Sequence, residues 1–196
     1  MLHNIPGPVL ARMKVLEDMN TKQKADGMGH FERLRQIPAE TGRFLALIAS
    51  TAPPGGFVEI GTSGGYSGLW LSLACRTTGR TMTTYELSEE KVAVAKETFR
   101  EAGVDDIVTV VQGDIRDSLD ELSDIAFCFL DTEKSLYEEC YKAVVPALVG
   151  GGLLLADNVV SHETELRTFL ERSLHDNRLD AVVVPVGSGV LFGRRT

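Results

Sequence analysis

The chain has 196 residues, enough for one domain that buries roughly 70% of the surface of its unfolded form. Hydrophobic residues make up 43% of it and charged residues 24%, the balance of a soluble globular protein. The formal net charge of −8 argues against nucleic acid or an anionic membrane as partner, because both require a basic face.

The cysteines and the N-terminus indicate a cytoplasmic protein. Cys75, Cys128 and Cys140 are scattered, odd in number and form no C-x-x-C pair, so we expect reduced side chains. The segment "MLHNIPGPVLARMKV" lacks the basic start and sustained apolar core of a signal peptide. No apolar run approaches the length of a membrane span.

Residues 1–35 are predicted to form a helical N-terminal extension. The spacing of apolar residues over 9–19 indicates a short amphipathic helix, and residues 21–30 then read as a mobile connection. Pro38 suits the first turn of the next helix, which the sequence "APPGG" ends.

From residue 57 onward, short apolar runs alternate with helical segments. The expected strands are 57–60, 81–86, 107–111, 125–130 and 152–156. The expected helices are 66–76, 88–102 and 134–148, with a less regular one at 115–122. This alternation is typical of an α/β fold in which helices cover both faces of a parallel sheet.

The C-terminal part breaks the alternation. A helix is expected over residues 161–176, followed by two apolar runs that Gly187 and Ser188 join. That pattern predicts a hairpin, so the last strand should run antiparallel to the others. The whole chain, 1–196, is therefore expected to be a single α/β domain.

The first strand ends in a glycine-rich loop, "FVEIGTSGGYSG". Glycines let a backbone turn tightly and approach a ligand closely. The dinucleotide pattern G-x-G-x-x-G fails here, because Ser63 stands in place of its second glycine. Glu59, just before the first glycine, would repel a pyrophosphate but attract a cation.

Acidic residues also end the next two strands. Glu86 lies where an acidic residue can hold two ribose hydroxyls, and Asp114 follows the third strand. A positively charged nucleoside without phosphate suits all three acids. We therefore expect S-adenosylmethionine as cofactor, against the simpler alternative of a glycine turn with two solvated acids.

The fourth and fifth strands end on oxygen-bearing side chains. Asp131 follows one, and Asp157 and Asn158 follow the other in "LLLADNVV". Tips of neighbouring parallel strands lie close together, and two carboxylates with one amide suit Mg²⁺ rather than zinc. Lys134 begins a helix that can direct its ammonium to the same place. The alternative is that Asp157 and Asn158 serve only as turn residues.

Four segments in order carry a resemblance to a known family: "FVEIGTSGGYSG", "YELSEEK", "FLDTEKSLY" and "LLLADNVV". Together they resemble the cation-dependent O-methyltransferases, the family of catechol and caffeoyl-CoA O-methyltransferases, between about residues 37 and 160. The glycine loop alone indicates only a class I methyltransferase. The D-x-x-K and A-D-N motifs are more specific.

The resemblance implies a fold, a reaction and a set of site residues. It implies a Rossmann-like sheet of order 3-2-1-4-5-7-6 and methyl transfer to a small hydroxylated molecule. Lys134 would be the general base, and Asp131, Asp157 and Asn158 would bind Mg²⁺ or another divalent cation. S-adenosylmethionine would be surrounded by Ile37, Glu59, Gly61, Thr62, Tyr66, Ser67, Glu86, Leu87, Asp114, Ile115 and Asp131.

Several alternatives stay open at this point. After Asp131 the chain has Thr132 and Glu133 instead of the aromatic residue of the animal catechol enzyme, and no tryptophan follows Asn158 as in plant relatives. The alternatives for the acceptor are therefore a catechol and another metabolite, and the alternative to an enzyme is a S-adenosylmethionine-binding module without turnover. A nicotinamide oxidoreductase is disfavoured by Glu59 and Ser63. The amphipathic N-terminus could support a homodimer.

Overall fold

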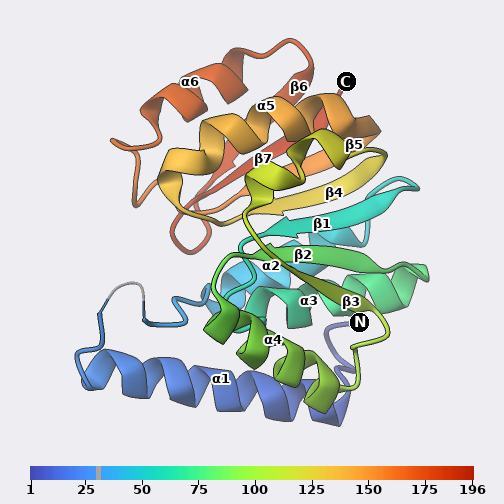
Figure 1. The fold of residues 1–196 in the computed structure, drawn as a ribbon. Helices are drawn as coiled ribbons and strands as arrows, with labels where there is room; N and C mark the ends of the chain where they lie inside the picture. Colours follow the sequence, from blue (N-terminus) through green and yellow to red (C-terminus); the bar gives the residue numbers. More distant parts are fainter. Residues whose placement is uncertain (30–31) are drawn as a thin grey trace.

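The structure is a computed structural model that describes residues 1–29 and 32–196. Its strands form one seven-stranded sheet in the order β3-β2-β1-β4-β5-β7-β6, which confirms the predicted order (Figure 1). The strands are β1 Gly56–Ile60, β2 Met82–Glu86, β3 Val108–Gln112, β4 Ile125–Leu130, β5 Leu148–Ala156, β6 Leu179–Val184 and β7 Val190–Arg195. Strand β7 is antiparallel to both neighbours, as predicted.

Helices cover both faces of this sheet (Figure 1). They are α1 Gly7–Ala25, α2 Ala39–Ala49, α3 Tyr66–Thr78, α4 Glu89–Ala102, α5 Tyr137–Ala147 and α6 Arg167–His175. Three short 3₁₀ helices, η1 Ile115–Asp117, η2 Leu119–Glu121 and η3 Lys134–Leu136, lie after β3 and β4. Within the described residues, no helix combines the length and apolar content that crossing a membrane requires.

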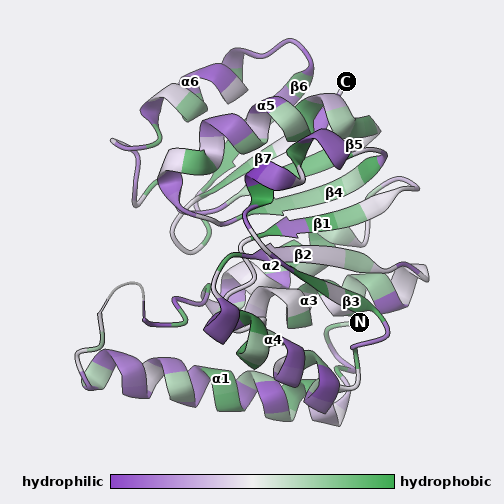
Figure 2. Ribbon diagram, in the orientation of Figure 1, coloured by the Kyte–Doolittle hydropathy of each residue, from purple (hydrophilic) through white to green (hydrophobic). Residues whose placement is uncertain are grey.

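Alternation along the strands builds two cores. Phe127 and Phe129 of β4 pack with helices α1 to α4, whereas Cys128 and Leu130 pack with α5 and α6. All six residues of β4 are buried, as expected for a central strand covered on both faces. Figure 2 shows the corresponding contrast between the mainly hydrophobic β4 and the polar outer turns of α4.

Local signals explain where helices begin and end. The Ser88 side chain accepts a hydrogen bond from the amide of Lys91 and caps α4, and acidic residues occupy the first turn of that helix. Gly103 ends α4 in the left-handed conformation that glycine adopts without strain. The polar face of α4 is thus compatible with a regular helix.

Some predicted boundaries were wrong. Helix α1 continues to Ala25, so residues 21–25 are helical rather than a mobile connection, and His30 lies outside the described residues. The segment 115–122 forms two 3₁₀ turns instead of a helix. Helix α6 begins only at Arg167, because residues 161–166 form turns. The β6–β7 connection spans residues 185–189, longer than the predicted two-residue turn.

Candidate functional site

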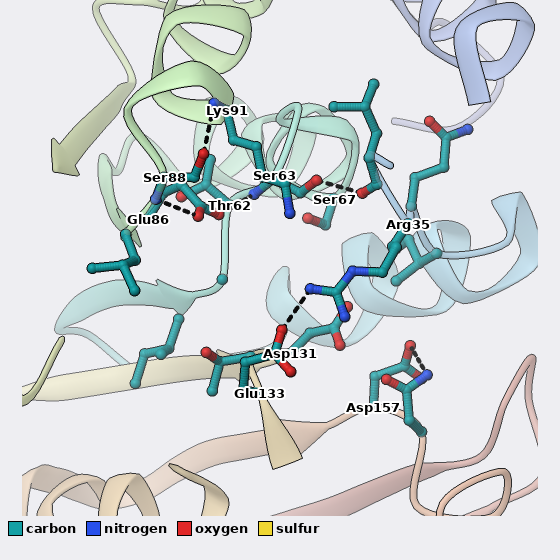
Figure 3. Close-up of a pocket in the computed structure, with 18 of the residues that line it drawn as sticks. Arg35, Thr62, Ser63, Ser67, Glu86, Ser88, Lys91, Asp131, Glu133 and Asp157 are labelled. Atoms are coloured by element: carbon teal, nitrogen blue, oxygen red, sulfur yellow. Dashed lines mark hydrogen bonds and ion pairs between the residues drawn. The ribbon is translucent and has the colours of Figure 1, made fainter. Parts of the chain in front are cut away.

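A cavity of about 1090 Å³ opens at the carboxyl ends of the parallel strands. Its wall combines the loops after β1 to β5 with the segment that links α1 to α2. Of the fourteen site residues predicted above, Glu59 does not line the cavity. The other thirteen do: Ile37, Gly61, Thr62, Tyr66, Ser67, Glu86, Leu87, Asp114, Ile115, Asp131, Lys134, Asp157 and Asn158. Figure 3 shows how side chains from these segments face one another.

Strand register brings the two aspartates together. Leu130 of β4 pairs with Ala156 of β5, so Asp131 and Asp157 are the next residues along neighbouring parallel strands. The amide of Asp157 donates to the carbonyl of Leu130 at 3.0 Å, which extends the ladder by one step. The positions of both carboxyl groups are therefore fixed by the sheet itself.

The two carboxyl groups are costly to ionise where they lie. Asp157 is 1% exposed, and its Oδ1 atom has no hydrogen-bond partner among the described residues. Burial and the neighbouring Asp131 raise the pKa of Asp157 to about 7. Burial also raises the pKa of Asp131, although Lys134 opposes the shift. A cation between these groups would relieve both penalties.

Lys134 supplies the positive charge at this point. Its Nζ atom donates to Asn158 Oδ1 at 2.6 Å and lies 3.4 Å from Asp131 Oδ1. It also donates to the hydroxyl of Tyr137 at 3.0 Å and to the carbonyl of Thr132 at 3.1 Å. The ammonium thus stands among oxygen atoms of the kind that bind hard cations.

Asn158 itself adopts a backbone conformation that is uncommon for a residue with a side chain. Its φ angle of 63° lies in the left-handed region, which asparagine tolerates better than most residues. Its Nδ2 donates to Asp157 Oδ2 at 3.2 Å, which leaves Oδ1 toward Lys134. The described residues contain no cluster of three His, Cys, Asp or Glu side chains that could hold a metal ion. The oxygen set of two carboxylates and one amide, with an unpartnered buried oxygen, fits Mg²⁺ nonetheless.

On the other side of the cavity, the glycine loop orients Glu86. The amide of Ser63 donates to Glu86 Oε2 at 2.8 Å, and the amide of Ser88 donates to Oε1 at 2.9 Å. Ser63 reaches this position with a φ angle of 48°, and Gly65 follows at 88°. Two backbone amides hold the carboxylate, so its remaining lone pairs can accept from a ligand hydroxyl.

Asp114, Ile115 and Leu87 form a separate part of the wall. The Arg116 side chain and backbone amide donate to Asp114, and these hydrogen bonds lower the pKa of Asp114 to about 2. Ile115 is buried, whereas Leu87 is 68% exposed. Both side chains line the cavity and provide apolar surface in its wall.

Glu59 and the hydroxyl of Tyr66 point elsewhere. Glu59 is completely buried beneath the loop and accepts from the hydroxyl of Thr84 at 2.6 Å. Burial raises the pKa of Glu59 to about 7. The Tyr66 hydroxyl donates to Glu17 of α1 at 2.7 Å. Glu59 therefore supports the loop from below instead of lining the cavity.

The segment between α1 and α2 contributes residues that the sequence did not single out. Figure 3 shows Arg35 reaching across the cavity, where it donates to Glu133 at 2.7 Å. Burial and the charge of Arg35 lower the pKa of Lys91, which also lines the cavity. In the sequence analysis, the only residue predicted to bind the cofactor from this segment was Ile37, which the resemblance to the O-methyltransferases implied. The contacts join residues far apart in sequence, which periodicity does not reveal.

Comparison with solved structures supports the fold. An O-methyltransferase from Bacillus cereus, solved in complex with SAH, superposes with a TM-score of 0.80 at 24% identity, covering 95% of this chain and 91% of that one. The SAH-bound methyltransferase of Podospora anserina gives a TM-score of 0.81 at 23% identity, covering 98% and 89%.

Comparison of the amino-acid sequence with known proteins identifies the family. Catechol O-methyltransferase of Mycobacterium tuberculosis is 32% identical over 126 residues, which cover 63% of this chain and 57% of that protein. Caffeoyl-CoA O-methyltransferase of Stellaria longipes is 25% identical over 178 residues, covering 79% and 73%. The family model described as O-methyltransferase matches residues 13–196. The chain therefore belongs to the O-methyltransferase family.

Proposed function

We propose that this O-methyltransferase transfers the methyl group of S-adenosylmethionine, with a divalent cation, to a small acceptor with adjacent hydroxyl groups. The observation that carries the proposal is that Asp131 and Asn158 both contact the ammonium of Lys134 in the wall of the cavity, with Asp157 hydrogen-bonded to Asn158 beside them. Solved relatives bound to SAH or SAM support the choice of cofactor.

The cofactor half would use the glycine loop and Glu86. Glu86, held by the amides of Ser63 and Ser88, would accept hydrogen bonds from the ribose hydroxyls. Leu87 and Ile115 would contact the adenine. The positive sulfonium would lie between these contacts and the carboxylate of Asp131, which also lines the cavity.

The acceptor half would use the strand tips. Asp131, Asp157 and Asn158 would hold Mg²⁺, whose Lewis acidity lowers the pKa of a bound hydroxyl. Lys134, in its neutral form, would take the hydroxyl proton at Nζ, and the acceptor oxygen would attack the methyl group in line. The bond between the methyl carbon and the sulfonium sulfur would break, and S-adenosylhomocysteine would leave. Holding both reactants close together and correctly oriented can lower the activation barrier by about 7–11 kcal/mol.

Calorimetry on the purified protein tests the cofactor. S-adenosylmethionine should bind without added metal, and Glu86→Ala should weaken it about 10–150-fold, because a hydrogen bond to a charged group is worth about 1.5–3 kcal/mol. Glu90→Ala, an exposed position on α4, should leave the affinity unchanged. Tight binding of NAD with no binding of S-adenosylmethionine would overturn the proposal.

A methyl-transfer assay over a panel of catechols and monohydroxylated compounds, with Mg²⁺ present, then tests the reaction. Turnover restricted to adjacent hydroxyls is expected. Turnover of monohydroxylated compounds only would reject the catechol-like acceptor but keep the enzyme class. Binding of the cofactor without turnover of any compound would favour a binding module.

A further inference from the structure

The hydroxyl of Tyr137 lies at the junction of the two strand tips and the lysine. Tyr137 is completely buried as the first residue of α5. Its oxygen lies 3.1 Å from the carbonyl of Asp157 and 3.4 Å from the carbonyl of Leu130. Lys134 Nζ approaches the same oxygen at 3.0 Å. One hydroxyl therefore connects the ends of β4 and β5 with the start of η3.

The direction of these hydrogen bonds follows from chemistry. A phenol has one proton to donate, and both carbonyl oxygens are acceptors only. The Tyr137 proton therefore points to a carbonyl at a strand tip, and a lone pair faces Lys134. The lysine amine donates a hydrogen bond to that lone pair. Because the strand-tip carbonyls orient the Tyr137 hydroxyl, they also set the direction of the hydrogen bond from Lys134.

Packing keeps the hydroxyl in place. The Tyr137 ring meets the Phe169 ring edge to face, with centroids 5.3 Å apart at 86°. The Lys134 amine lies 4.7 Å from the centroid of the Tyr137 ring. A lysine has a flexible four-carbon stem, so without a fixed partner its amine would sample many positions. Tyr137 limits that freedom together with Asn158 and Thr132, and it is the rigidly packed ring among these partners.

We propose that Tyr137 is a positioning residue that holds the Lys134 amine beside Asn158, where it can reach the acceptor oxygen. This inference rests on the proposed role of Lys134 in methyl transfer. A purely structural tyrosine would contribute to stability but would not affect catalysis through the lysine.

The same helix supplies a matched control. Tyr141 is also completely buried, and its ring packs edge to face on Phe169 at 5.7 Å and 88°. Its hydroxyl donates to Asp176 at 2.9 Å, however, and makes no contact with Lys134 among the described residues. Tyr137→Phe and Tyr141→Phe therefore each delete one buried hydroxyl on α5, of which only the first contacts the lysine.

Kinetics on the Mg²⁺-loaded enzyme compare these variants, after thermal melting has shown that each is folded. Tyr137→Phe should lower kcat about 10–10²-fold, because a displacement of about 1 Å can cost that much, with KM and cofactor affinity within twofold of the parent. Tyr141→Phe should keep the parent kcat. In a Lys134→Ala background, Tyr137→Phe should have no further effect, since the two residues act as one unit.

A second measurement needs no activity. Limited acetylation with acetic anhydride, followed by peptide mass spectrometry, reports how readily Lys134 reacts relative to exposed lysines. Its side chain is 14% exposed, and Tyr137→Phe should release it and increase its modification several-fold. Tyr141→Phe should not change it. If the parent transfers no methyl group, the proposed function fails while acetylation still decides the role of Tyr137.

The inference is overturned if Tyr137→Phe leaves Lys134 acetylation at the parent level. It is equally overturned if kcat in an active enzyme does not fall, or if it falls by the same factor when Lys134 is already alanine.

Discussion

Asp157 is the residue at which stability and the proposed metal site conflict. Its pKa is raised to about 7 by burial and by Asp131, whereas in the unfolded chain it is near 4. Between these values the folded protein keeps the proton that the unfolded chain loses. Stability therefore falls as pH rises through this window, and the full penalty is present above pH 7.

Asp157→Asn should consequently stabilise the protein at high pH in the presence of a chelator. At pH 8 the variant should melt several degrees above the parent, since each kcal/mol is worth about 2–4 °C in a chain of this size. At pH 5 the parent carboxyl is protonated and resembles the amide, so the two melting temperatures should converge. Scanning calorimetry at both pH values measures the difference.

Added Mg²⁺ provides the control for this prediction. At pH 8 it should raise the melting temperature of the parent more than that of Asp157→Asn, because only the parent offers both carboxylates. A difference between the two proteins that does not depend on pH would contradict the assignment of the penalty to ionised Asp157.

Lys134 gives the second prediction at this scale. Lys134→Ala should lower kcat about 10²–10⁴-fold, the usual contribution of a positioned acid–base group. The affinity for S-adenosylmethionine should stay within a few-fold, because Glu86 and Ile115 lie at the ends of β2 and β3, which β1 separates from β4. Lys142→Ala, on the outer face of α5, is a suitable control for loss of charge. A kcat within a few-fold of the parent would show that another group accepts the proton.

Sequence could predict much of this site because strand tips of a parallel sheet converge. Asp131, Asp157 and Asn158 were predicted to meet from that rule alone, and the register of β4 and β5 brings the two aspartates together. The direction of the Glu59 side chain was not predictable, because a strand residue faces one side or the other according to its register. Arg35 reaches the cavity only through tertiary packing.

At the scale of elements, the strands were predicted more accurately than the helices. Runs such as residues 125–130 are apolar throughout and match β4 completely. Strand β5 begins at Leu148 rather than at residue 152, so it includes all three glycines from Gly150 to Gly152. The last turn of α1, "KQKA", has few apolar residues, and its helical conformation continues from the buried part before it.

Helix α1 does more than extend the chain, because it supports the glycine loop. Leu16 is completely buried, and a Cβ atom at Gly64 would lie 3.5 Å from its side chain. Leu16→Ala should lower the free energy of unfolding by about 2–5 kcal/mol, measured by urea denaturation. Leu10→Ala, at a position 50% exposed, should change it by less than about 0.5 kcal/mol. Equal effects of the two substitutions would mean that α1 is not part of the core.

At the scale of the whole molecule, residues from both halves of the chain build one cavity. The segment after α1 and the loops after β1 to β3 form the side proposed for the cofactor, and the tips of β4 and β5 form the side proposed for the acceptor. In the sheet order β1 is the neighbour of β4, so the two sides of the cavity adjoin where these two strands meet. The homodimer stays a prediction, which sedimentation equilibrium would test.

The rate of methyl transfer from S-adenosylmethionine to a catechol, measured in excess chelator and again after Mg²⁺ is restored, tests the central claim most directly. The account predicts that the chelator abolishes the rate and that Mg²⁺ restores it in the parent. In Asp157→Ala the rate should stay lost, while calorimetry still detects cofactor binding. A full rate in excess chelator would contradict the account and leave Asp157 and Asn158 as turn residues at the end of a strand.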